Sequence, residues 1–556
     1  MITENFISLF EQSIKANWRL PAMTDYDEKR TMTYGDVGKE IARLHLLFER
    51  IGLKRGSKVS LTGKNGCHWC IVYIATVTYG CVIVPILQDF NTNDIQHIVN
   101  HSESTLLFIS DHLWEAVDED KMSALHAAFS LNDLRCIYRK GDEPIQSLSE
   151  MTFADFDKRY PKGFSAANVH FTSVPNSEVV SINYTSGTTG FSKGVMLTGN
   201  NLAGNVIFGF KTHLLERGDR ALAFLPLAHA YGCAFDFLTS FCNGAHTTYL
   251  GKIPAPKVLL KAFAEIRPSA IFTVPLIIEK VYRNQIQPML NSRTMRVALN
   301  IPIIENTVLG TIRRKLTDAF GGAFKEVIIG GAPLNPEVEA FFTRIGFKFT
   351  VGYGMTECAP LICYTPHYQF ISFSVGKILP GMEVTIDSKD PQTIDGEILV
   401  RGEHVMAGYY KNEEATRAVL SEDGWMRTGD VGTVDANGNL FIRGRCKSML
   451  LSASGQNIYP EEIEAKLNNM PFVQESLIIE NSHKKLVAFV YPDYAAVDEA
   501  QISHAELSII MENNRKTLNE MVASYEQVIG VQLYPNEFAK TPKKSIKRYL
   551  YSNLLK

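Results

Sequence analysis

A short segment at residues 182–195 places glycines, hydroxyl side chains and a lysine directly after an apolar run. Glycine allows the backbone to approach an anion closely, and backbone N–H groups together with Ser and Thr hydroxyls can surround phosphate oxygens. A lysine beside such a loop adds a charge-assisted contact of roughly 1.5–3 kcal/mol. The segment therefore predicts a phosphate-binding loop, made of Thr185, Ser186, Gly187, Thr188, Thr189, Gly190 and Lys193.

This loop is not a Walker phosphate loop. In the Walker pattern a lysine and then a Ser or Thr directly follow the second glycine. Here Phe191 and Ser192 separate Gly190 from Lys193. A polar surface turn is the alternative interpretation of the same residues.

A second polar cluster lies later in the chain. Gly352 and Gly354 would again allow a ligand to approach the backbone, and Tyr353 offers an aromatic face on which an adenine ring can stack. Thr356 can hold a phosphate oxygen, and Glu357 supplies the hard anionic oxygen that Mg²⁺ prefers. A surface turn is the alternative here as well.

The elements that would position these clusters alternate between short apolar strands and helices, which predicts an α/β architecture on mainly parallel sheets. Strands are expected at 58–62, 81–85, 106–110, 135–138 and 179–184, and helices within 31–50 and at 69–78. Later, short strands separated by turns predict a small antiparallel β subdomain, at 383–386, 396–401 and 440–443. A last unit is expected to have helices near 460–470 and 505–525 and strands at 475–479 and 485–491.

Composition and charge exclude several classes of protein. A chain of 556 residues is too long for one core and is expected to form about two to four domains. Its 45% hydrophobic and 21% charged content argues against wholesale disorder. A net charge of −3 provides no basic field for nucleic acid, so no nucleic-acid partner is expected.

The sequence indicates neither a transmembrane segment nor a metal cluster. The N-terminus lacks the basic and apolar blocks of a signal peptide. The longest apolar stretch, residues 70–87, is interrupted by polar residues, Gly and Pro, and is expected to form a buried helix and then a strand. Cys67 and Cys70 are the only closely spaced cysteines, and we expect them to pack in the core. Scattered free thiols are typical of a reducing, cytoplasmic location.

The loop at 184–190 and the residues 196–201 that follow it resemble the phosphate-loop signature of the adenylate-forming (AMP-binding) superfamily. This superfamily includes acyl-CoA synthetases, luciferases and the adenylation domains of peptide synthetases. Further matching motifs follow in order from about residue 30 to residue 548, and they are most similar to those of long-chain fatty acid–CoA ligases.

The resemblance implies a fold and its boundaries. The expected fold class is α/β: a large N-terminal domain of mainly parallel α/β sheets plus a small β subdomain, followed by a small mobile α+β C-terminal domain. The AMP-binding domain would span residues 1–445, with the β-rich subdomain at about 375–445. The C-terminal lid domain would span residues 446–556.

The resemblance also implies roles for individual residues. His229 would lie beside the carboxylate-binding pocket, although a structural histidine is the ordinary alternative. The nucleotide would be bound by Gly331, Ala332, Gly352, Tyr353, Gly354, Thr356, Asp430 and Arg445 in addition to the phosphate loop, and Mg²⁺ by Thr185 and Glu357. Lys447 would be the hinge about which the C-terminal domain swings, and the thiol tunnel would be lined by Ser454 and Gly455.

The C-terminal motif departs from the family pattern. The family places a catalytic lysine in a Pro-Lys-Thr-x-x-Gly-Lys or Thr-Pro-Thr-x-Lys motif. Alignment on Thr541 and Pro542 puts Ser545 at the position of that lysine. Lys544 lies one residue away and Lys547 two, and Lys544 is the favoured candidate. A solvated basic tail is the alternative.

The implied activity is that of an acid–thiol ligase. ATP, with Mg²⁺, would activate a carboxylic acid, most simply a medium- to long-chain fatty acid, as acyl-AMP with release of pyrophosphate, and coenzyme A would then accept the acyl group. The apolar and aromatic segment 230–244 fits the wall of an acyl tunnel, and core packing explains it equally well. Peripheral contact with a membrane is compatible with such a substrate.

Three other activities stay open at this stage. One is a ligase that loads the acyl group onto a phosphopantetheine-bearing acyl carrier protein, which would have to be a separate partner. Another is a catalytically impaired nucleotide-binding homologue, because of the departure at Ser545. The last is a monooxygenase of the luciferase type, which no residue specifically favours.

Overall fold

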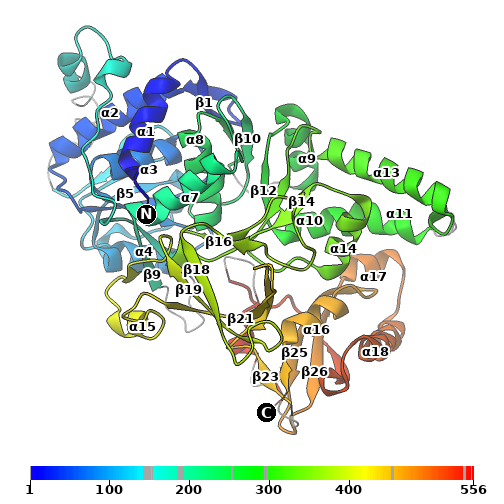
Figure 1. Ribbon diagram of the computed structural model, residues 1–556. Coiled ribbons are helices and arrows are strands. Elements are labelled where there is room, and N and C mark those ends of the chain that lie inside the picture. Colours follow the sequence, from blue (N-terminus) through cyan, green and yellow to red (C-terminus); the bar gives the residue numbers. More distant parts are fainter. Residues whose placement is uncertain are drawn as a thin grey trace.

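The computed structural model describes residues 2–141, 152, 154–185, 193–251, 255–292, 295, 298–452, 456–541, 546–551, 554 and 555. Figure 1 shows a large N-terminal body, in which helices surround several sheets, and a smaller unit formed by the C-terminal residues. This arrangement confirms the expected fold class, an α/β body with a small β subdomain and an α+β C-terminal unit.

An eight-stranded sheet forms part of the N-terminal body. In spatial order its strands are β20 (Gly408–Tyr409), β9 (Lys193–Thr198), β8 (Val179–Thr185), β4 (Val82–Ile86), β3 (Lys58–Thr62), β5 (Ser104–Ile109), β6 (Ala127–Ser130) and β7 (Cys136–Arg139). Strands β8, β4, β3, β5 and β6 run parallel to one another. At one edge β7 pairs antiparallel with β6. At the other edge β9 pairs antiparallel with β8, and β20 pairs antiparallel with β9. The five strands expected before residue 185 all belong to this sheet, within about two residues of the expected bounds.

Helix α2 (Tyr34–Ile51) confirms the helix expected within 31–50. It begins after Thr33, whose side chain accepts a hydrogen bond from the backbone N–H of Asp36, while Asp36 bonds back to Thr33. This reciprocal capping satisfies backbone donors that the first turn leaves without partners. The helix ends at Gly52, which adopts φ +80°, a conformation that glycine reaches without steric cost.

Helix α3 (Cys67–Thr78) explains the longest apolar stretch of the sequence. Nearly all its side chains are buried within the protein, and strand β4 follows it, as expected. Trp69 and Tyr73 stack with their ring centroids 5.7 Å apart, and Phe237 packs edge-on against both rings. Cys67 and Cys70 are buried free thiols. In the part of the chain that the structure describes, no helix is long and apolar enough to cross a bilayer.

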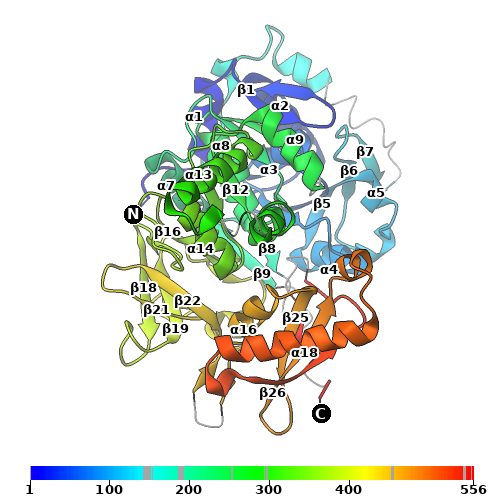
Figure 2. The ribbon, with the colours of Figure 1, turned by 90° about the vertical axis from the view of Figure 1, so that its right-hand side faces the viewer.

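Two further sheets complete the N-terminal body. One has the order β10 (Arg220–Ala223), β11 (His246–Tyr249), β1 (Pro21–Asp25) and β2 (Arg30–Thr33). The other is parallel and contains β12 (Ile271–Thr273), β13 (Val327–Ile329) and β14 (Phe349–Val351). Helices beside this parallel sheet are α9 (Pro256–Ile266), α10 (Pro275–Val281), α13 (Pro302–Ala319) and α14 (Pro336–Ile345), as Figures 1 and 2 show.

After β14 the chain changes to antiparallel pairing. A short sheet contains β15 (Tyr353–Gly354), β16 (Leu361–Tyr364) and β17 (Lys377–Ile378). A second one contains β18 (Met382–Asp387), β19 (Gly396–Gly402), β21 (Met426–Val434) and β22 (Leu440–Arg445). These strands confirm the expected small antiparallel β region, and the last of them ends where the domain boundary is proposed.

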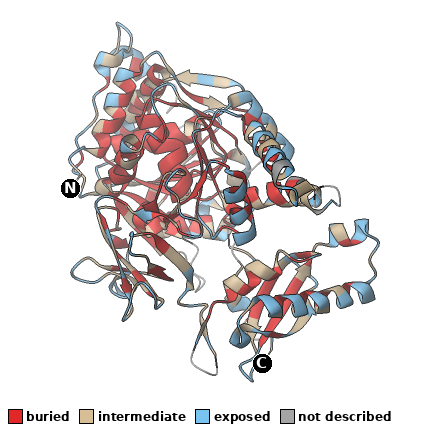
Figure 3. Cartoon of the chain, turned by 45° about the vertical axis from the view of Figure 1, so that its right-hand side comes forward, coloured by how far each residue is buried: buried red, intermediate tan, exposed pale blue. Residues whose placement is uncertain are grey.

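The C-terminal residues have a core of their own. A hairpin of β23 (Leu450–Leu451) and β24 (Asn457–Ile458) precedes α16 (Pro460–Leu467), and a three-stranded sheet follows, made of β25 (Val473–Glu480), β26 (Leu486–Pro492) and β27 (Val528–Leu533). Figure 2 shows α18 (His504–Met521) lying across this sheet, and Figure 3 shows buried residues between them. The helices and strands expected after residue 446 are therefore confirmed.

Several polar contacts join this unit to the N-terminal body, among them a hydrogen bond of 3.3 Å from the Tyr459 hydroxyl to Asp395 Oδ2. Arg283 donates to the backbone carbonyl of Asn468 at 2.8 Å. The side-chain amides of Asn335 and Asn469 exchange hydrogen bonds, the shorter of which is 2.7 Å long. Polar contacts of this kind cost little to break, because water can replace each partner.

Helix α14 carries a buried carboxyl group at Glu339, which is only 4% exposed. Its oxygen Oε1 accepts a hydrogen bond from the backbone N–H of Phe373. Burial outweighs this hydrogen bond and raises the pKa of Glu339 to about 7. The folded protein therefore binds a proton at this site more tightly than the unfolded chain does.

We predict that Glu339→Gln flattens the pH dependence of stability. The stabilisation from protonated Glu339 is complete below pH 4.5, the pKa of an ordinary glutamic acid, and is lost as pH rises through about 7. The variant should gain thermal stability over the wild type between pH 5 and pH 8, by on the order of 2 kcal/mol. Thermal unfolding at several pH values measures this gain. The exposed Glu414→Gln serves as the control, and an equal pH profile for wild type and Glu339→Gln would contradict the assignment.

Candidate functional site

The predicted phosphate loop joins two antiparallel strands. Thr185 ends β8 and lies opposite Lys193, the first residue of β9. The Thr185 hydroxyl donates to the carbonyl of Lys193 at 3.5 Å. The rest of the predicted loop, namely Ser186, Gly187, Thr188, Thr189 and Gly190, lies outside the described residues. The strand pairing thus brings the first and last residues of the loop together at the end of a rigid hairpin.

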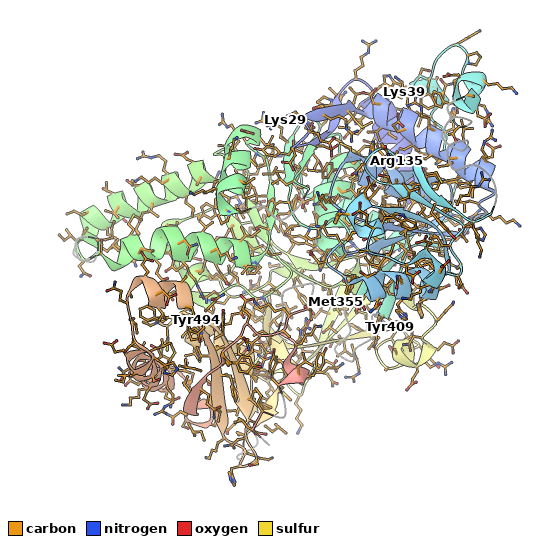
Figure 4. All side chains as sticks on the ribbon, turned by 180° about the vertical axis from the view of Figure 1, so that it is seen from behind. Lys29, Lys39, Arg135, Met355, Tyr409 and Tyr494 are labelled. Atoms are coloured by element: carbon orange, nitrogen blue, oxygen red, sulfur yellow. The ribbon has the colours of Figure 1, made fainter. Side chains whose placement is uncertain are left out.

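Tyr409 connects Lys193 to Glu357. The Lys193 ammonium lies over the ring of Tyr409, 4.7 Å from the ring centroid, and the hydroxyl of Tyr409 donates to Glu357 Oε1 at 3.0 Å. Figure 4 labels Tyr409, together with Met355 of the turn that carries Glu357. The structure therefore joins two residues that are far apart in the sequence, through a third that the sequence analysis did not identify.

The turn after β15 has a backbone geometry that depends on glycine. A Cβ atom on Gly354 would lie 2.2 Å from the carbonyl oxygen of Pro360, so a side chain there would force the backbone to move. Thr356 begins a single 3₁₀ turn and is buried, and Glu357 beside it is half-buried. The backbone N–H of Met406 donates to the carbonyl of Glu357 at 2.8 Å. Main-chain contacts on both sides thus hold this turn in place.

A buried hydrogen bond attaches the other side of the same turn to the β subdomain. The hydroxyl of Tyr353 donates to Asp430 Oδ2 at 2.7 Å, and both residues are buried. Arg445 lies opposite Asp430 in the β21–β22 pairing, with its Nε 3.3 Å from Asp430 Oδ1. Burial raises the pKa of Asp430, and Arg445 opposes that rise. The structure therefore places Asp430 and Arg445, which the sequence analysis named as separate nucleotide-binding candidates, in contact with each other.

The remaining N-terminal candidates lie near the carboxyl end of β13. Gly331 and Ala332 follow this strand and are exposed, and Gly331 has φ +86°. His229 is half-buried, and its Nδ1 accepts a hydrogen bond from the backbone N–H of Tyr231 at 3.4 Å. Tyr231 in turn donates through its hydroxyl to the carbonyl of Ile328 at 3.0 Å. The His229 segment and the glycine turn thus flank the same strand.

The apolar segment at 230–244 folds mainly into a π-helix, Gly232–Thr239, whose side chains are all buried. It contains one acidic group, Asp236, and neither carboxyl oxygen of Asp236 has a hydrogen-bond partner among the described residues. Burial raises the pKa of Asp236 well above its usual range, which favours the uncharged form of this carboxyl. The segment is therefore an apolar element beside His229.

The proposed hinge and thiol residues lie where the C-terminal unit begins. Lys447 is exposed in the turn between β22 and β23. Ser454 and Gly455 lie outside the described residues, in the connection between β23 and β24. That connection is closed by a hydrogen bond from the backbone N–H of Ser452 to the carbonyl of Gln456, 2.9 Å long.

The candidate lysines near the C-terminus belong to the loop that follows Lys540, and contacts on both sides hold the ends of this loop together. Lys540 pairs with Glu475 at 2.5 Å and forms a β-bridge with Ile546. The backbone N–H of Lys547 donates to the carbonyl of Ala539 at 2.8 Å. Lys547 therefore lies at the base of this loop, whereas Lys544 lies outside the described residues.

An ion pair anchors the end of this loop to the C-terminal core. Arg548 binds the buried carboxylate of Glu464 on α16 and lies 3.5 Å from Glu461. Glu464 Oε1 also accepts a hydrogen bond of 2.6 Å from the backbone N–H of Ile478. Both oxygens of this buried carboxylate are thus bonded, which is the condition for burying a charge at acceptable cost.

Comparison with known proteins gives consistent matches over the chain. The family model described as AMP-binding enzyme matches residues 10–410, and that described as AMP-binding enzyme C-terminal domain matches residues 447–554. The peroxisomal long chain acyl-CoA synthetase 6 of Arabidopsis thaliana is 31% identical over 83% of this chain and 68% of its own length. The long-chain-fatty-acid–CoA ligase FadD15 of Mycobacterium bovis is 27% identical over 84% of this chain and 78% of its own length.

Solved structures share the fold at lower sequence identity. ATP-bound MatB from Rhodopseudomonas palustris has a TM-score of 0.76 and 21% identity, with the whole of both chains covered. The o-succinylbenzoate coenzyme A synthetase MenE from Bacillus subtilis, in complex with AMP, has a TM-score of 0.74 and 18% identity over 97% of both chains.

We predict that Arg548→Met destabilises the C-terminal unit, because it leaves the buried Glu464 without its cation. The expected loss is about 3 kcal/mol, and Arg548→Lys should restore part of it. Denaturant unfolding of the full chain measures the loss. Arg417→Met removes an exposed ion pair with Glu413 and is the control, for which little change is expected. Equal effects of Arg548→Met and Arg417→Met would contradict the anchoring role.

Proposed function

The chain belongs to the AMP-binding enzyme family, and on that premise we propose that it joins a medium- to long-chain fatty acid to coenzyme A at the expense of ATP. The family and its acyl-CoA synthetase relatives make it an AMP-forming acid–thiol ligase. The identity of the acid, the identity of the thiol and the roles of individual residues are parts of the proposal.

The proposal rests on a set of contacts that links Lys193 at one end of the site to Arg445 at the other. Lys193 lies on the ring of Tyr409, which donates to Glu357. Glu357 shares its turn with Tyr353, which donates to Asp430, and Asp430 pairs with Arg445. Cationic groups at both ends and two carboxylates between them match a nucleoside triphosphate and its metal ion.

In this proposal each end of the set binds one part of ATP. The phosphates are bound by Thr185, Ser186, Gly187, Thr188, Thr189, Gly190, Lys193 and Thr356. Asp430 accepts hydrogen bonds from the ribose hydroxyls, and Arg445 contacts the ribose or a phosphate. Gly331, Ala332, Gly352, Tyr353 and Gly354 surround the adenine.

The residues present fit a magnesium ion that arrives with ATP. Mg²⁺ is usually held by one or two carboxylates together with substrate phosphates, and no cluster of His, Cys, Asp or Glu in the described part of the chain could hold a metal unaided. Glu357 would supply the carboxylate and Thr185 a hydroxyl oxygen. When bound, the ion would neutralise charge on the phosphates.

Two transfer steps make up the reaction. In the first, an oxygen of the acid attacks the α-phosphorus of ATP, and the bond to pyrophosphate breaks with its electron pair leaving on pyrophosphate. In the second, the thiolate sulfur of coenzyme A attacks the acyl carbon, and AMP leaves with the electrons of the acyl–oxygen bond. Catalysis of the first step is mostly positioning and charge neutralisation. The His229 side chain would line the carboxylate pocket.

The first step needs the C-terminal lysine at the site, whereas the second needs the thiol of coenzyme A there. We propose that the C-terminal unit, residues 446–556, turns about Lys447 between the two steps, so that the lysine leaves the site and the thiol can enter. Ser454 and Gly455 would then line the thiol tunnel. The hydrogen bonds that Arg283, Asn335 and Asp395 form with the C-terminal unit are compatible with such a movement, because water can replace each partner when they break.

A fatty acid is favoured over other acids by the relatives and by one element of the site. Relatives of this chain are described as long-chain acyl-CoA synthetases, and the buried π-helix beside His229 offers an apolar wall. Structural neighbours also include ligases for o-succinylbenzoate and anthranilate, so the fold alone does not select the acid. We place the reaction in the cytoplasm because all nine cysteines are free thiols.

The acid can be identified by assaying AMP release with coenzyme A present, for a panel of acids from acetate to palmitate and including benzoates. We expect the highest kcat/KM for fatty acids of about eight carbons or more, because each buried methylene adds about 0.8 kcal/mol. Holo acyl carrier protein in place of coenzyme A tests the other thiol. A kcat/KM that does not change with chain length would contradict the fatty-acid assignment. The absence of any acid-dependent exchange of pyrophosphate into ATP would contradict the ligase activity itself.

A second experiment assigns the C-terminal lysine. We expect Lys544→Ala to slow adenylation by about 100-fold, the cost of removing one charged donor from a transition state, with a smaller effect on thioester formation from added acyl-AMP. Lys547→Ala should change adenylation less, because the backbone of Lys547 is tied to Ala539 at the base of the loop. Lys543→Ala is the matched control. Normal adenylation by both the Lys544 and Lys547 variants would refute the role of this tail.

A further inference from the structure

Strand pairing and a hydrogen bond fix the backbone of Tyr409. This residue belongs to β20, which pairs with β9, and it lies opposite Val195 in that pairing. Its backbone N–H donates to the hydroxyl of Thr416 at 2.9 Å. The neighbouring residue Gly408 has φ +132°, and a Cβ atom there would lie 2.9 Å from the Thr416 side chain. The backbone at Tyr409 is therefore held by its surroundings independently of the ligands.

The side chain of Tyr409 makes a different contact at each of its two parts. The face of the ring carries the Lys193 ammonium at 4.7 Å from the centroid, which is a cation–π contact. The hydroxyl donates to Glu357 Oε1 at 3.0 Å. Tyr409 is only 8% exposed, so both contacts form away from bulk water.

The hydroxyl acts as a donor over the whole working pH range. An ordinary tyrosine has a pKa of about 10, well above neutral pH. The phenol therefore stays protonated, and its hydrogen bond fixes the orientation of the Glu357 carboxylate. A tyrosine at this position thus orders the carboxylate without adding charge of its own.

Tyr409 also gives two opposite charges separate partners. Lys193 and Glu357 would attract each other directly if nothing lay between them, and an ion pair would occupy both groups. With Tyr409 in place, the ammonium lies on the ring face and the carboxylate at the hydroxyl. Each charged group then keeps bonding capacity for a ligand.

We propose that Tyr409 is a positioning residue, which holds the phosphate-binding lysine and the metal-binding carboxylate apart in the arrangement that Mg²⁺–ATP requires. This inference rests on the proposed function of Lys193 and Glu357. It predicts that the hydroxyl and the ring of Tyr409 serve different parts of the ligand: the hydroxyl serves the metal end through Glu357, and the ring serves the phosphate end through Lys193.

Two substitutions separate these contributions. Tyr409→Phe keeps the ring and removes the hydroxyl, whereas Tyr409→Leu removes both. Tyr410→Phe is the matched control, because the adjacent tyrosine donates its hydroxyl to Glu103, away from the set of contacts. Calorimetric titration with ATP, in the absence and presence of Mg²⁺, measures binding without turnover, and the Mg²⁺ dependence of acid-dependent pyrophosphate exchange measures the reaction.

For Tyr409→Phe we expect ATP binding without Mg²⁺ to stay within about two-fold of the wild type. The Mg²⁺ concentration for half-maximal exchange should rise about ten-fold, in line with the loss of one hydrogen bond to a charged group. Tyr409→Leu should also weaken ATP binding without Mg²⁺, because Lys193 loses the ring and can pair with Glu357. Tyr410→Phe should match the wild type in every measurement.

The double variant Glu357→Gln, Tyr409→Phe tests whether the hydroxyl acts through Glu357. If it does, Tyr409→Phe causes no further change in the Mg²⁺ dependence of ATP binding once Glu357 is replaced. Equal losses of ATP binding with and without Mg²⁺ in Tyr409→Phe, or a Mg²⁺ dependence unchanged from the wild type, would overturn the inference. A wild type that binds no ATP would instead refute the proposed function.

Discussion

Two phenolic hydroxyl groups hold the turn at residues 352–358 by donating to carboxylates from opposite sides. Tyr353 within the turn donates to Asp430 of the β subdomain, and Tyr409 of the large sheet donates to Glu357 of the turn. The turn therefore joins the edge strand of the eight-stranded sheet to the antiparallel β region. Each pair also contacts a cation: Lys193 lies on the ring of Tyr409, and Arg445 lies beside Asp430.

These hydrogen bonds stabilise the structure because they satisfy carboxylates that are removed from water. A carboxylate removed from water must be paired or hydrogen-bonded, and Asp430 has both Tyr353 and Arg445 as partners. Burial raises the pKa of Asp430, whereas Arg445 favours its charged form. The same reasoning separates this acid from Asp236, whose carboxyl oxygens have no hydrogen-bond partner among the described residues and whose pKa burial raises well above its usual range.

Much of the fold followed from local patterns. Apolar strand runs bounded by turns identified β3, β4, β5, β7 and β8, and the capping residues Thr33 and Asp36 mark the start of α2. Strand β1 is less evident, because it pairs with β11, more than two hundred residues later. Pairing over such a separation depends on where other elements pack and leaves little signal in the strand itself. The antiparallel addition of β9 and β20 at one edge of a largely parallel sheet is a similar case.

The kinds of group at the site and their order can be read from the residues alone, because glycine, hydroxyl and carboxylate side chains have chemistry that can be recognised without coordinates. Lys193, Glu357, Asp430 and Arg445 were thus identified as separate candidates. Which of these residues contact one another, and which other side chains connect them, depends on how the whole chain packs. Tyr409 carries no local signal, since a tyrosine in a short strand is ordinary, and its role arises from the pairing of β20 with β9. Contact between distant residues is a property of packing, and packing is decided by the whole chain.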